Sequence, residues 1–139
     1  MTVFNSTLYT KLDVNKYLGD ARDRSGRRVP IPFEHIITTE TTADTTNLCV
    51  LPANCEVVFM HIIGVTTLGA TQTIALGDSG VVNRYLVAQL LILEQKGYLA
   101  GAGMRYRPTA DTIVVATYAV ANPTATANYR GCFFIVPGN

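Results

Sequence analysis

From residue 33 onward, the chain alternates between short hydrophobic runs and polar turns. The runs are rich in Val, Ile, Thr, Tyr and Phe, the residues that favour strands. In chain order they read EHIITTE, TNLCVL, EVVFMHIIGV, TQTIALG, YLAGAGMRYR, DTIVVATYAV and ATANYRGCFFIV. Turn material separates them, in the form of PANC, TLGA, GDSG, RPTAD and ANPT. Many short strands at this spacing predict an all-β fold, an antiparallel β-sandwich of jelly-roll type.

One segment departs from this strand pattern. NRYLVAQLLILEQK, residues 83–96, places Leu86, Leu90 and Leu93 on one helical face behind Asn83, a residue suited to a helix N-cap. The same letters fit a short helix followed by an edge strand equally well. We therefore expect at most one short helix.

Two of the predicted strands are apolar on both faces. Alternation along EVVFMHII sets Val57, Phe59, His61 and Ile63 opposite Val58, Met60 and Ile62. The last strand sets Tyr129, Gly131, Phe133 and Ile135 opposite Arg130, Cys132, Phe134 and Val136. A two-layer sandwich ordinarily leaves one face of each sheet in water. Apolar residues on both faces therefore predict that another element or a second subunit covers these strands, and they favour a homo-oligomer.

The N-terminal part differs from the rest in charge. Residues 1–32 carry six Lys or Arg and three Asp, a net charge of +3, whereas the remainder carries −2. Two prolines close this stretch and favour an extended path. We predict two regions, an extended arm at 1–32 and a sandwich domain at 33–139. Such an arm either becomes ordered on a partner or remains a solvated leader. Aspartates among its arginines dilute the positive field, so direct nucleic-acid binding is not expected.

The composition limits where the protein acts. The chain has 139 residues, of which 48% are hydrophobic and only 15% charged, against a usual charged share of about 25%. A surface so poor in charge predicts that partners cover part of it. The longest apolar runs are far shorter than the ~20 residues that span a bilayer, and the N-terminus lacks the pattern of a secretory signal. We expect no membrane contact and synthesis in the cytoplasm.

The turn Gly77-Asp78-Ser79-Gly80 has the letters that surround the catalytic serine of chymotrypsin-like proteases. A serine nucleophile needs a histidine base that a carboxylate orients. The two histidines, His35 and His61, lie in apolar strand patterns, and Val81-Val82 follows the quartet where the protease pattern has Gly-Pro. We therefore predict a structural turn and no enzymatic activity. Glycine tolerates positive φ there, and the Asp and Ser side chains bond neighbouring backbone groups.

The cysteines do not form a recognisable metal motif. Cys49, Cys55 and Cys132 include no C-x-x-C pair and are odd in number. A zinc site would require the fold to bring them together with His61, which the spacing does not demand. We expect three buried thiols, with no metal and no cofactor.

Two longer stretches resemble a known family. LPANCEVVFMHIIGVTTLGATQTIALGDSGVVNRYL and GMRYRPTADTIVVATYAVANPT are similar to a pattern common in small virion proteins of tailed bacteriophages, the capsid decoration or cement proteins. The pattern joins an LPA turn, a long apolar strand, an LGA-x-T hairpin, a GD-x-G…RYL turn and a late AD-x-IVVAT strand. It covers residues 48–123, about half of the chain, and does not include the arm.

The resemblance implies a structural protein of the virion. Family members are β-sandwich or jelly-roll head proteins that sit as oligomers, often trimers, across neighbouring major capsid proteins on the capsid surface. It implies that Gly77 and Gly80 give the turn its backbone freedom, that Asp78 and Ser79 cap backbone groups, and that Arg84 with Tyr85 anchors the outgoing segment. We add the hypothesis that the arm pairs with carboxylates of the coat protein through Arg22, Arg24, Arg27 and Arg28.

Other roles stay open at this point. A jelly-roll module that binds a carbohydrate or receptor would stack a sugar on an exposed aromatic ring. The candidate rings are those of Tyr98, Tyr106, Tyr118 and Tyr129. A minor tail or vertex component of the virion would also fit this composition.

Overall fold

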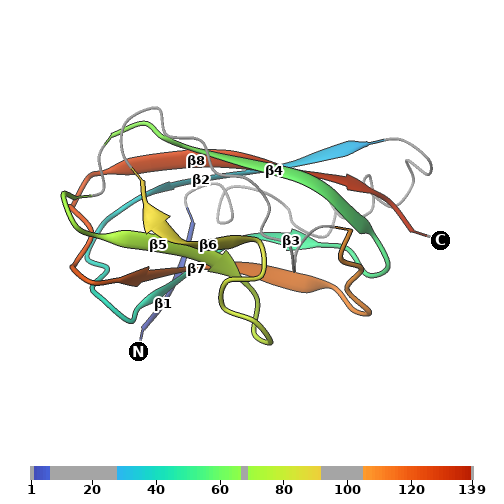
Figure 1. The fold of residues 1–139 in the computed structure, drawn as a ribbon, viewed down its shortest axis with the longest axis horizontal. Helices are drawn as coiled ribbons and strands as arrows, with labels where there is room; N and C mark the ends of the chain where they lie inside the picture. Colours follow the sequence, from blue (N-terminus) through green and yellow to red (C-terminus); the bar gives the residue numbers. More distant parts are fainter. Residues whose placement is uncertain (1, 7–27, 67–68, 92–104, 139) are drawn as a thin grey trace.

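A computed structural model describes residues 2–6, 28–66, 69–91 and 105–138 of the chain. These residues form two β-sheets that pack face to face (Figure 1). The larger sheet contains β1 (Val3–Asn5), β3 (Thr45–Leu51), β7 (Thr112–Ala119), β5 (Thr73–Gly77) and β6 (Leu86–Leu90), in that order. The smaller sheet contains β2 (Val29–Ile36), β8 (Asn128–Val136) and β4 (Glu56–Gly64). The predicted all-β sandwich is confirmed, and the described residues contain no helix.

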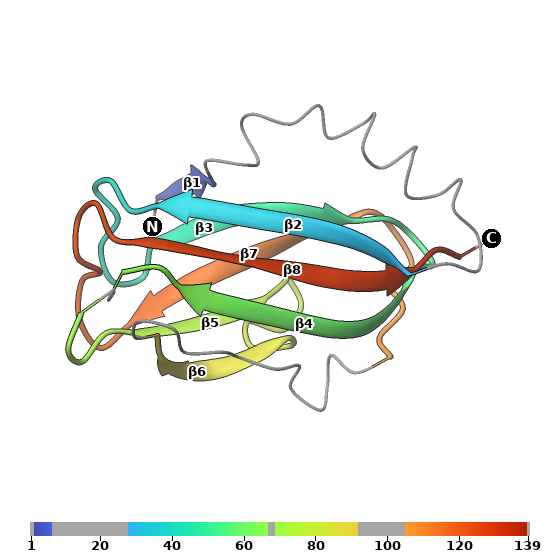
Figure 2. The same ribbon diagram turned by 90° about the horizontal axis from the view of Figure 1, so that it is seen from above.

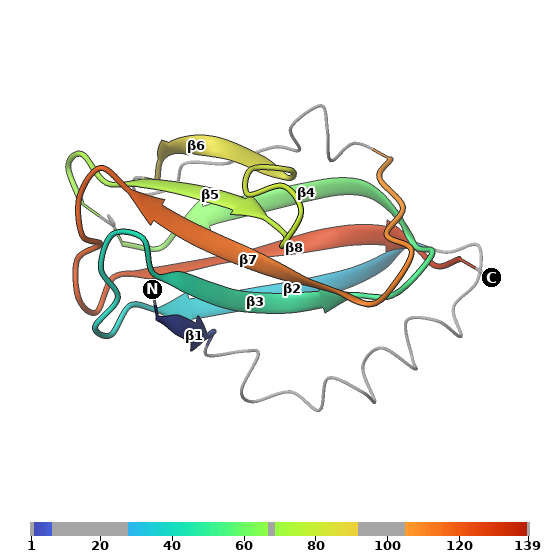
Figure 3. The ribbon, with the colours of Figure 1, turned by 90° about the horizontal axis from the view of Figure 1, so that it is seen from below.

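The strand order has the nested pattern of a jelly roll. β2 pairs with β8 in the smaller sheet, and β3 pairs with β7 in the larger one. Strands from early in the chain therefore pair with strands from late in the chain. β4 then joins the far side of β8, and β5 joins the far side of β7. Figure 2 shows β8 between β2 and β4, and Figure 3 shows the opposite sheet with β7 near its centre. Except for β1, which runs parallel to β3, neighbouring strands are antiparallel.

Aromatic side chains fill the space between the two sheets. Phe33 and Phe133 lie with ring centroids 5.7 Å apart, and Tyr85 meets Phe133 edge-on at 5.2 Å. Gly131 is the cross-strand partner of Phe33, and a Cβ there would come within 2.5 Å of the Phe33 ring. The absence of a side chain at residue 131 therefore makes room for the phenyl ring in the core.

Several details of the sequence interpretation differ from the structure, and one is that residues 105–107, the described part of the predicted strand YLAGAGMRYR, form no strand. The boundary predicted at residue 32 falls inside β2, and residues 3–5 of the predicted arm form β1. Leu86–Leu90, part of the possible helix, is a strand, while residues 92–104 lie outside the described part. A bulge between Val57 and Phe59 breaks the predicted alternation in β4, so that Val57, Met60 and Ile62 are buried.

The charged arm lies largely outside the described residues. Arg22, Arg24 and Arg27 fall in the undescribed range 7–27, whereas Arg28 is exposed immediately before β2. No helix among the described residues is long and apolar enough to cross a membrane.

Candidate functional site

The Gly-Asp-Ser-Gly quartet forms the corner that follows β5. The Asp78 carboxylate accepts hydrogen bonds from the backbone N–H groups of Gly80 and Val81, both at 2.9 Å. Its second oxygen accepts from Arg84 Nε at 2.6 Å and from the Tyr85 hydroxyl at 3.3 Å. A buried aspartate therefore organises the corner, and Ser79 beside it is exposed.

The corner is closed from the side by an aromatic ring. The Arg84 guanidinium lies 3.9 Å from the centroid of the Tyr106 ring, and Tyr106 meets Tyr85 edge-on at 6.4 Å. The cation over the ring adds a favourable electrostatic contact to the ion pair with Asp78. Burial by itself would lower the pKa of Arg84, but its hydrogen bond to Asp78 outweighs that effect and the net pKa is raised. Arg84 thus joins the corner to the segment before β7.

The two glycines of the corner have different environments. A Cβ at Gly77 would lie 2.1 Å from the carbonyl oxygen of Val81 and 2.2 Å from that of Val82. A Cβ at Gly80 would meet its nearest atom, Asp78 Oδ1, at an ordinary 3.4 Å. Neither of these glycines has a positive φ; among the described glycines, Gly69 alone does. The close approach of the chain, rather than backbone freedom, makes glycine necessary at residue 77.

A protease-like site is not assembled by these residues. Ser79 follows the larger sheet at the end of β5, whereas His35 and His61 lie on β2 and β4 of the smaller sheet. The His35 side chain is buried and bonded to Glu40. Within the described ranges, no three His, Cys, Asp or Glu side chains form a group that could hold a metal. The three cysteines are buried, and burial raises the pKa of Cys55 to about 12 and of Cys132 to about 11.

The tyrosines considered for sugar stacking have other roles. Tyr118 and Tyr129 are buried in the core, and Tyr106 is half-buried beneath Arg84. Tyr98 lies outside the described residues. Two buried rings, and a third with Arg84 over its face, cannot present a face to a sugar, so these three tyrosines do not form such a platform.

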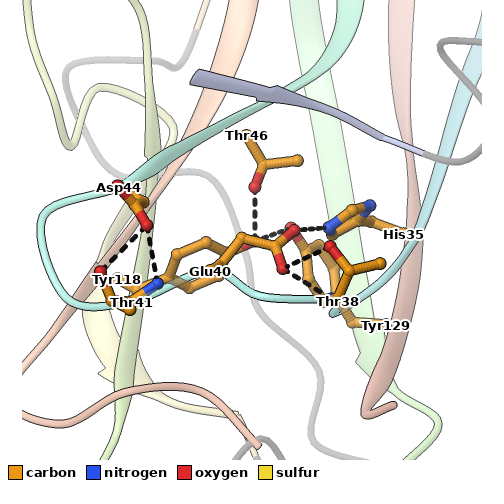
Figure 4. Close-up of polar contacts among 8 residues, drawn as sticks. All are labelled: His35, Thr38, Glu40, Thr41, Asp44, Thr46, Tyr118 and Tyr129. Carbon is orange, nitrogen blue, oxygen red and sulfur yellow. Dashed lines mark hydrogen bonds and ion pairs between the residues drawn. The ribbon is translucent and has the colours of Figure 1, made fainter. Parts of the chain in front are cut away.

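A buried polar network lies at the end of the sandwich where β2 leads toward β3 (Figure 4). His35 Nε2 donates to Glu40 Oε1, and the other oxygen of Glu40 accepts from the Thr38 backbone N–H at 2.6 Å. Beside this pair, the Tyr118 hydroxyl bonds to both Thr46 and Tyr129 at 2.8 Å. The His35–Glu40 contact ties the connection between β2 and β3 to β2, and the Tyr118 hydroxyl joins β7 to β3 of its own sheet and to β8 of the smaller sheet.

Acid is expected to destabilise the fold through two buried carboxylates, those of Glu40 and Asp78. Burial by itself would raise the pKa of Glu40, but hydrogen bonds from His35 and from backbone N–H groups outweigh it, so the pKa falls below 4.5. The pKa of Asp78 is likewise lowered from 3.8, because bonds from Arg84, Val81 and Gly80 outweigh burial. The stability that both groups contribute is therefore fully present above about pH 4.5 and is lost as the pH falls through their folded pKa values.

Thermal unfolding followed by circular dichroism between pH 7 and pH 3 would measure this loss. The Glu40→Gln variant is expected to have a lower melting temperature at pH 7 and a weaker pH dependence below 4.5. If the melting temperatures of wild type and variant fall equally with pH over that range, Glu40 does not contribute to the acid sensitivity.

The outward side of the smaller sheet is unusually apolar. The exposed or half-buried side chains that we call the outer sheet face are Pro30, Pro32, Glu34, Ile36, Phe59, His61, Ile63, Asn128, Arg130, Phe134 and Val136. Phe59 is 40% exposed, and its ring lies 5.9 Å from that of Phe134. Glu34 and Arg130, the two charged members of this face, are opposite in sign and cross-strand partners. A surface of this kind is typical of protein contacts rather than of a catalytic site.

A second group of charges lies where β4 begins. The Glu56 carboxylate accepts from Arg105 Nε at 2.8 Å and from Arg107 Nη2 at 2.6 Å. The side chain of Glu56 is only 12% exposed, whereas those of Arg105 and Arg107 are 78% and 62% exposed. One largely buried carboxylate therefore positions two guanidinium groups at the surface. No local pattern in the sequence marks these arginines, because Arg105 and Arg107 lie 49 and 51 residues from Glu56 along the chain.

Comparison with known proteins relates this chain to structures of phage capsids. No protein-family model matches the sequence, and no curated protein is significantly similar to it. A chain of "Capsid of Ralstonia phage GP4" matches with a TM-score of 0.70 and 19% identity, over 84% of this chain and 88% of that one. A chain of "Cyanophage Pam1 capsid asymmetric unit" matches with a TM-score of 0.66 and 21% identity, over 81% and 87%.

A third structure extends the same likeness. It is a chain of "Acidic stable capsid structure of Helicobacter pylori bacteriophage KHP30", with a TM-score of 0.59 and 20% identity, over 82% of this chain and 91% of that one. At these identities the likeness establishes a shared fold, which extends over nearly the whole length of each neighbour.

Proposed function

We propose that this chain is a structural protein of a tailed-bacteriophage virion that decorates and stabilises the capsid surface. In this role it binds across neighbouring major capsid proteins as a homo-oligomer, with a trimer as the specific expectation. The observation that carries the proposal is the shared fold with three chains from phage capsid structures, each matched over at least 87% of its own length.

The chemistry of the described surface supports the same role. Only 15% of the residues are charged, and the outer sheet face offers apolar contacts that suit a neighbouring subunit. The histidines and Ser79 lie apart, and the described residues contain no candidate metal cluster. A decoration protein requires contact surfaces rather than a reactive group, because modest contacts that repeat over a shell add up to strong attachment.

The number of copies per particle tests this proposal. Quantitative mass spectrometry of purified virions, with the major capsid protein as the internal standard, is expected to give a copy number comparable with that of the coat protein. A dozen copies or fewer would assign the chain to a vertex or the tail, and its absence from virions would refute a structural role. Native mass spectrometry of the purified chain measures the oligomer, and a monomer at micromolar concentration would contradict the trimer.

A further inference from the structure

The two ends of the sandwich differ in chemistry. At one end lie the start of β2, the turn from β3 to β4, residues 105–111 and the end of β8, and we call this the arginine end. At the other end lie the connections at 37–44, 65–72 and 120–127, of which 67–68 are outside the described residues, and we call this the threonine end. Figure 1 shows the arginine end at the right, near the C-terminus, and the threonine end at the left.

Strand register brings the exposed arginines to one end. Val29 and Val57 pair with the same residue of β8, Ile135, from opposite sides. Arg28 precedes Val29, and Glu56 precedes Val57. These two residues therefore lie on either side of the end of β8 in the smaller sheet. The Arg105 N–H donates to the Val57 carbonyl at 2.8 Å, which places the segment with Arg105 beside the start of β4.

The charge that this end presents to solvent is positive. Arg28, Arg105 and Arg107 are exposed, whereas Glu56 is largely buried. Asp111 is the exposed carboxylate of this end among the described residues, and it accepts the backbone N–H of Ala53 at 2.9 Å. Each guanidinium has five N–H donors. Arg105 and Arg107 each use one of them to bind Glu56, so further donors remain on both groups. Their shared carboxylate fixes their position before a partner arrives, which reduces the entropy lost on binding.

The described connections of the threonine end place no charged side chain at the surface. Its three connections contain no Lys or Arg, and their two acidic residues, Glu40 and Asp44, are 3% and 8% exposed. The residues exposed there are Thr, Ala, Asn and Val, such as Thr38, Thr42, Val120, Asn122 and Ala125. The field of the described residues is therefore positive at one end of the long axis and weak at the other.

We propose that the arginine end faces the capsid shell and binds a carboxylate-rich surface of the coat protein, while the threonine end points away from the shell. This orientation rests on the proposed function. Arginine guanidinium groups bind carboxylates through directional, charge-assisted hydrogen bonds, which fix orientation as well as affinity. A nucleic acid is a poorer fit, because three exposed cations beside Asp111 fall short of the roughly 6–10 phosphate contacts of typical binders. In addition, Arg84 covers the Tyr106 ring at this end, so that ring does not offer a free face on which a base could stack.

The test measures binding of the purified full-length chain to heads assembled without it. The variants are Arg28→Gln and the double variant Arg105→Gln/Arg107→Gln. The control is Thr39→Arg, which adds an exposed cation to the threonine end. A second control, Ala125→Glu, puts a charge on the threonine end. Because the double variant leaves Glu56 without these two partners, its folding is checked by circular dichroism, and Arg28→Gln provides an independent measurement with an intact Glu56 cluster.

At 50 mM salt we expect the double variant to bind at least tenfold more weakly, and Arg28→Gln about threefold more weakly, while both controls stay within twofold. The difference should shrink at 300 mM salt, since screening weakens exposed ion pairs. Equal weakening by Thr39→Arg and Arg28→Gln, or strong weakening by Ala125→Glu alone, would overturn the orientation and leave the proposed function intact.

Two other outcomes would also overturn the inference. Failure of the wild-type chain to bind heads would refute the proposed function and the orientation with it. Arginine-dependent binding to a 30-base-pair DNA duplex, with no arginine dependence of binding to heads, would assign the arginine end to nucleic acid.

Discussion

Replacing Asp78 with alanine is expected to lower the free energy of unfolding by about 3–5 kcal/mol, whereas Ser79→Ala should change it by less than about 0.5 kcal/mol. Asp78 is 7% exposed and accepts hydrogen bonds from two backbone N–H groups, from Arg84 and from Tyr85. Its removal leaves these donors without their acceptor and Arg84, whose side chain is only 16% exposed, without its counter-ion. Ser79 is exposed and makes none of these contacts.

Urea unfolding at pH 7, followed by circular dichroism, measures both changes. The pair is well matched because the residues are adjacent and both variants end in alanine. Asp78→Asn adds a further comparison, since an amide retains one acceptor oxygen but not the charge, so its loss should be intermediate. Equal stability of the Asp78→Ala and Ser79→Ala variants would contradict the role of Asp78 as the organiser of this corner.

Alanine at residue 77 is expected to cost at least about 3 kcal/mol, and alanine at residue 80 less than about 0.5 kcal/mol. The added methyl at residue 77 would overlap two backbone carbonyl groups, those of Val81 and Val82, at 2.1 and 2.2 Å. Backbone atoms cannot move aside without opening the corner that Asp78 holds. At residue 80 the methyl meets its neighbours at 3.4 Å or more, so nothing has to shift.

The same unfolding measurement on Gly77→Ala and Gly80→Ala separates the two effects. Both variants make the same chemical change within four residues of each other, so a general preference for glycine in turns would affect them alike. A loss of similar size for both would indicate that backbone conformation, rather than the close approach of residues 81 and 82, requires glycine here.

The geometry around this quartet shows why a short motif does not by itself establish a function. In this chain the first Gly and the Asp of the quartet hold a corner, and the Ser lies exposed beside them. A protease would need a histidine next to that serine. Both histidines instead lie on the opposite sheet.

The sequence predicted most strands of the sandwich, and the exceptions have clear reasons. The runs that became β3, β4, β5, β7 and β8 were found because their Val, Ile, Thr and aromatic content is a local property. The start of β2 was assigned to the arm, whose two closing prolines, Pro30 and Pro32, favour an extended path. β2 lies at the edge of its sheet, where a missing N–H can face away from the ladder without loss of a bond.

By itself, the sequence determined the all-β class and the position of the corner after β5, because hydrophobic runs and turn residues act over a few neighbours. Only the tertiary structure decided which distant side chains meet. Thr46 and Tyr118 are 72 residues apart, and Glu56 lies 49 and 51 residues from its two arginines. Such contacts depend on strand order and register, which bring residues together without any local mark in the sequence. For the same reason the two chemically different ends of the sandwich become visible only once the chain is folded.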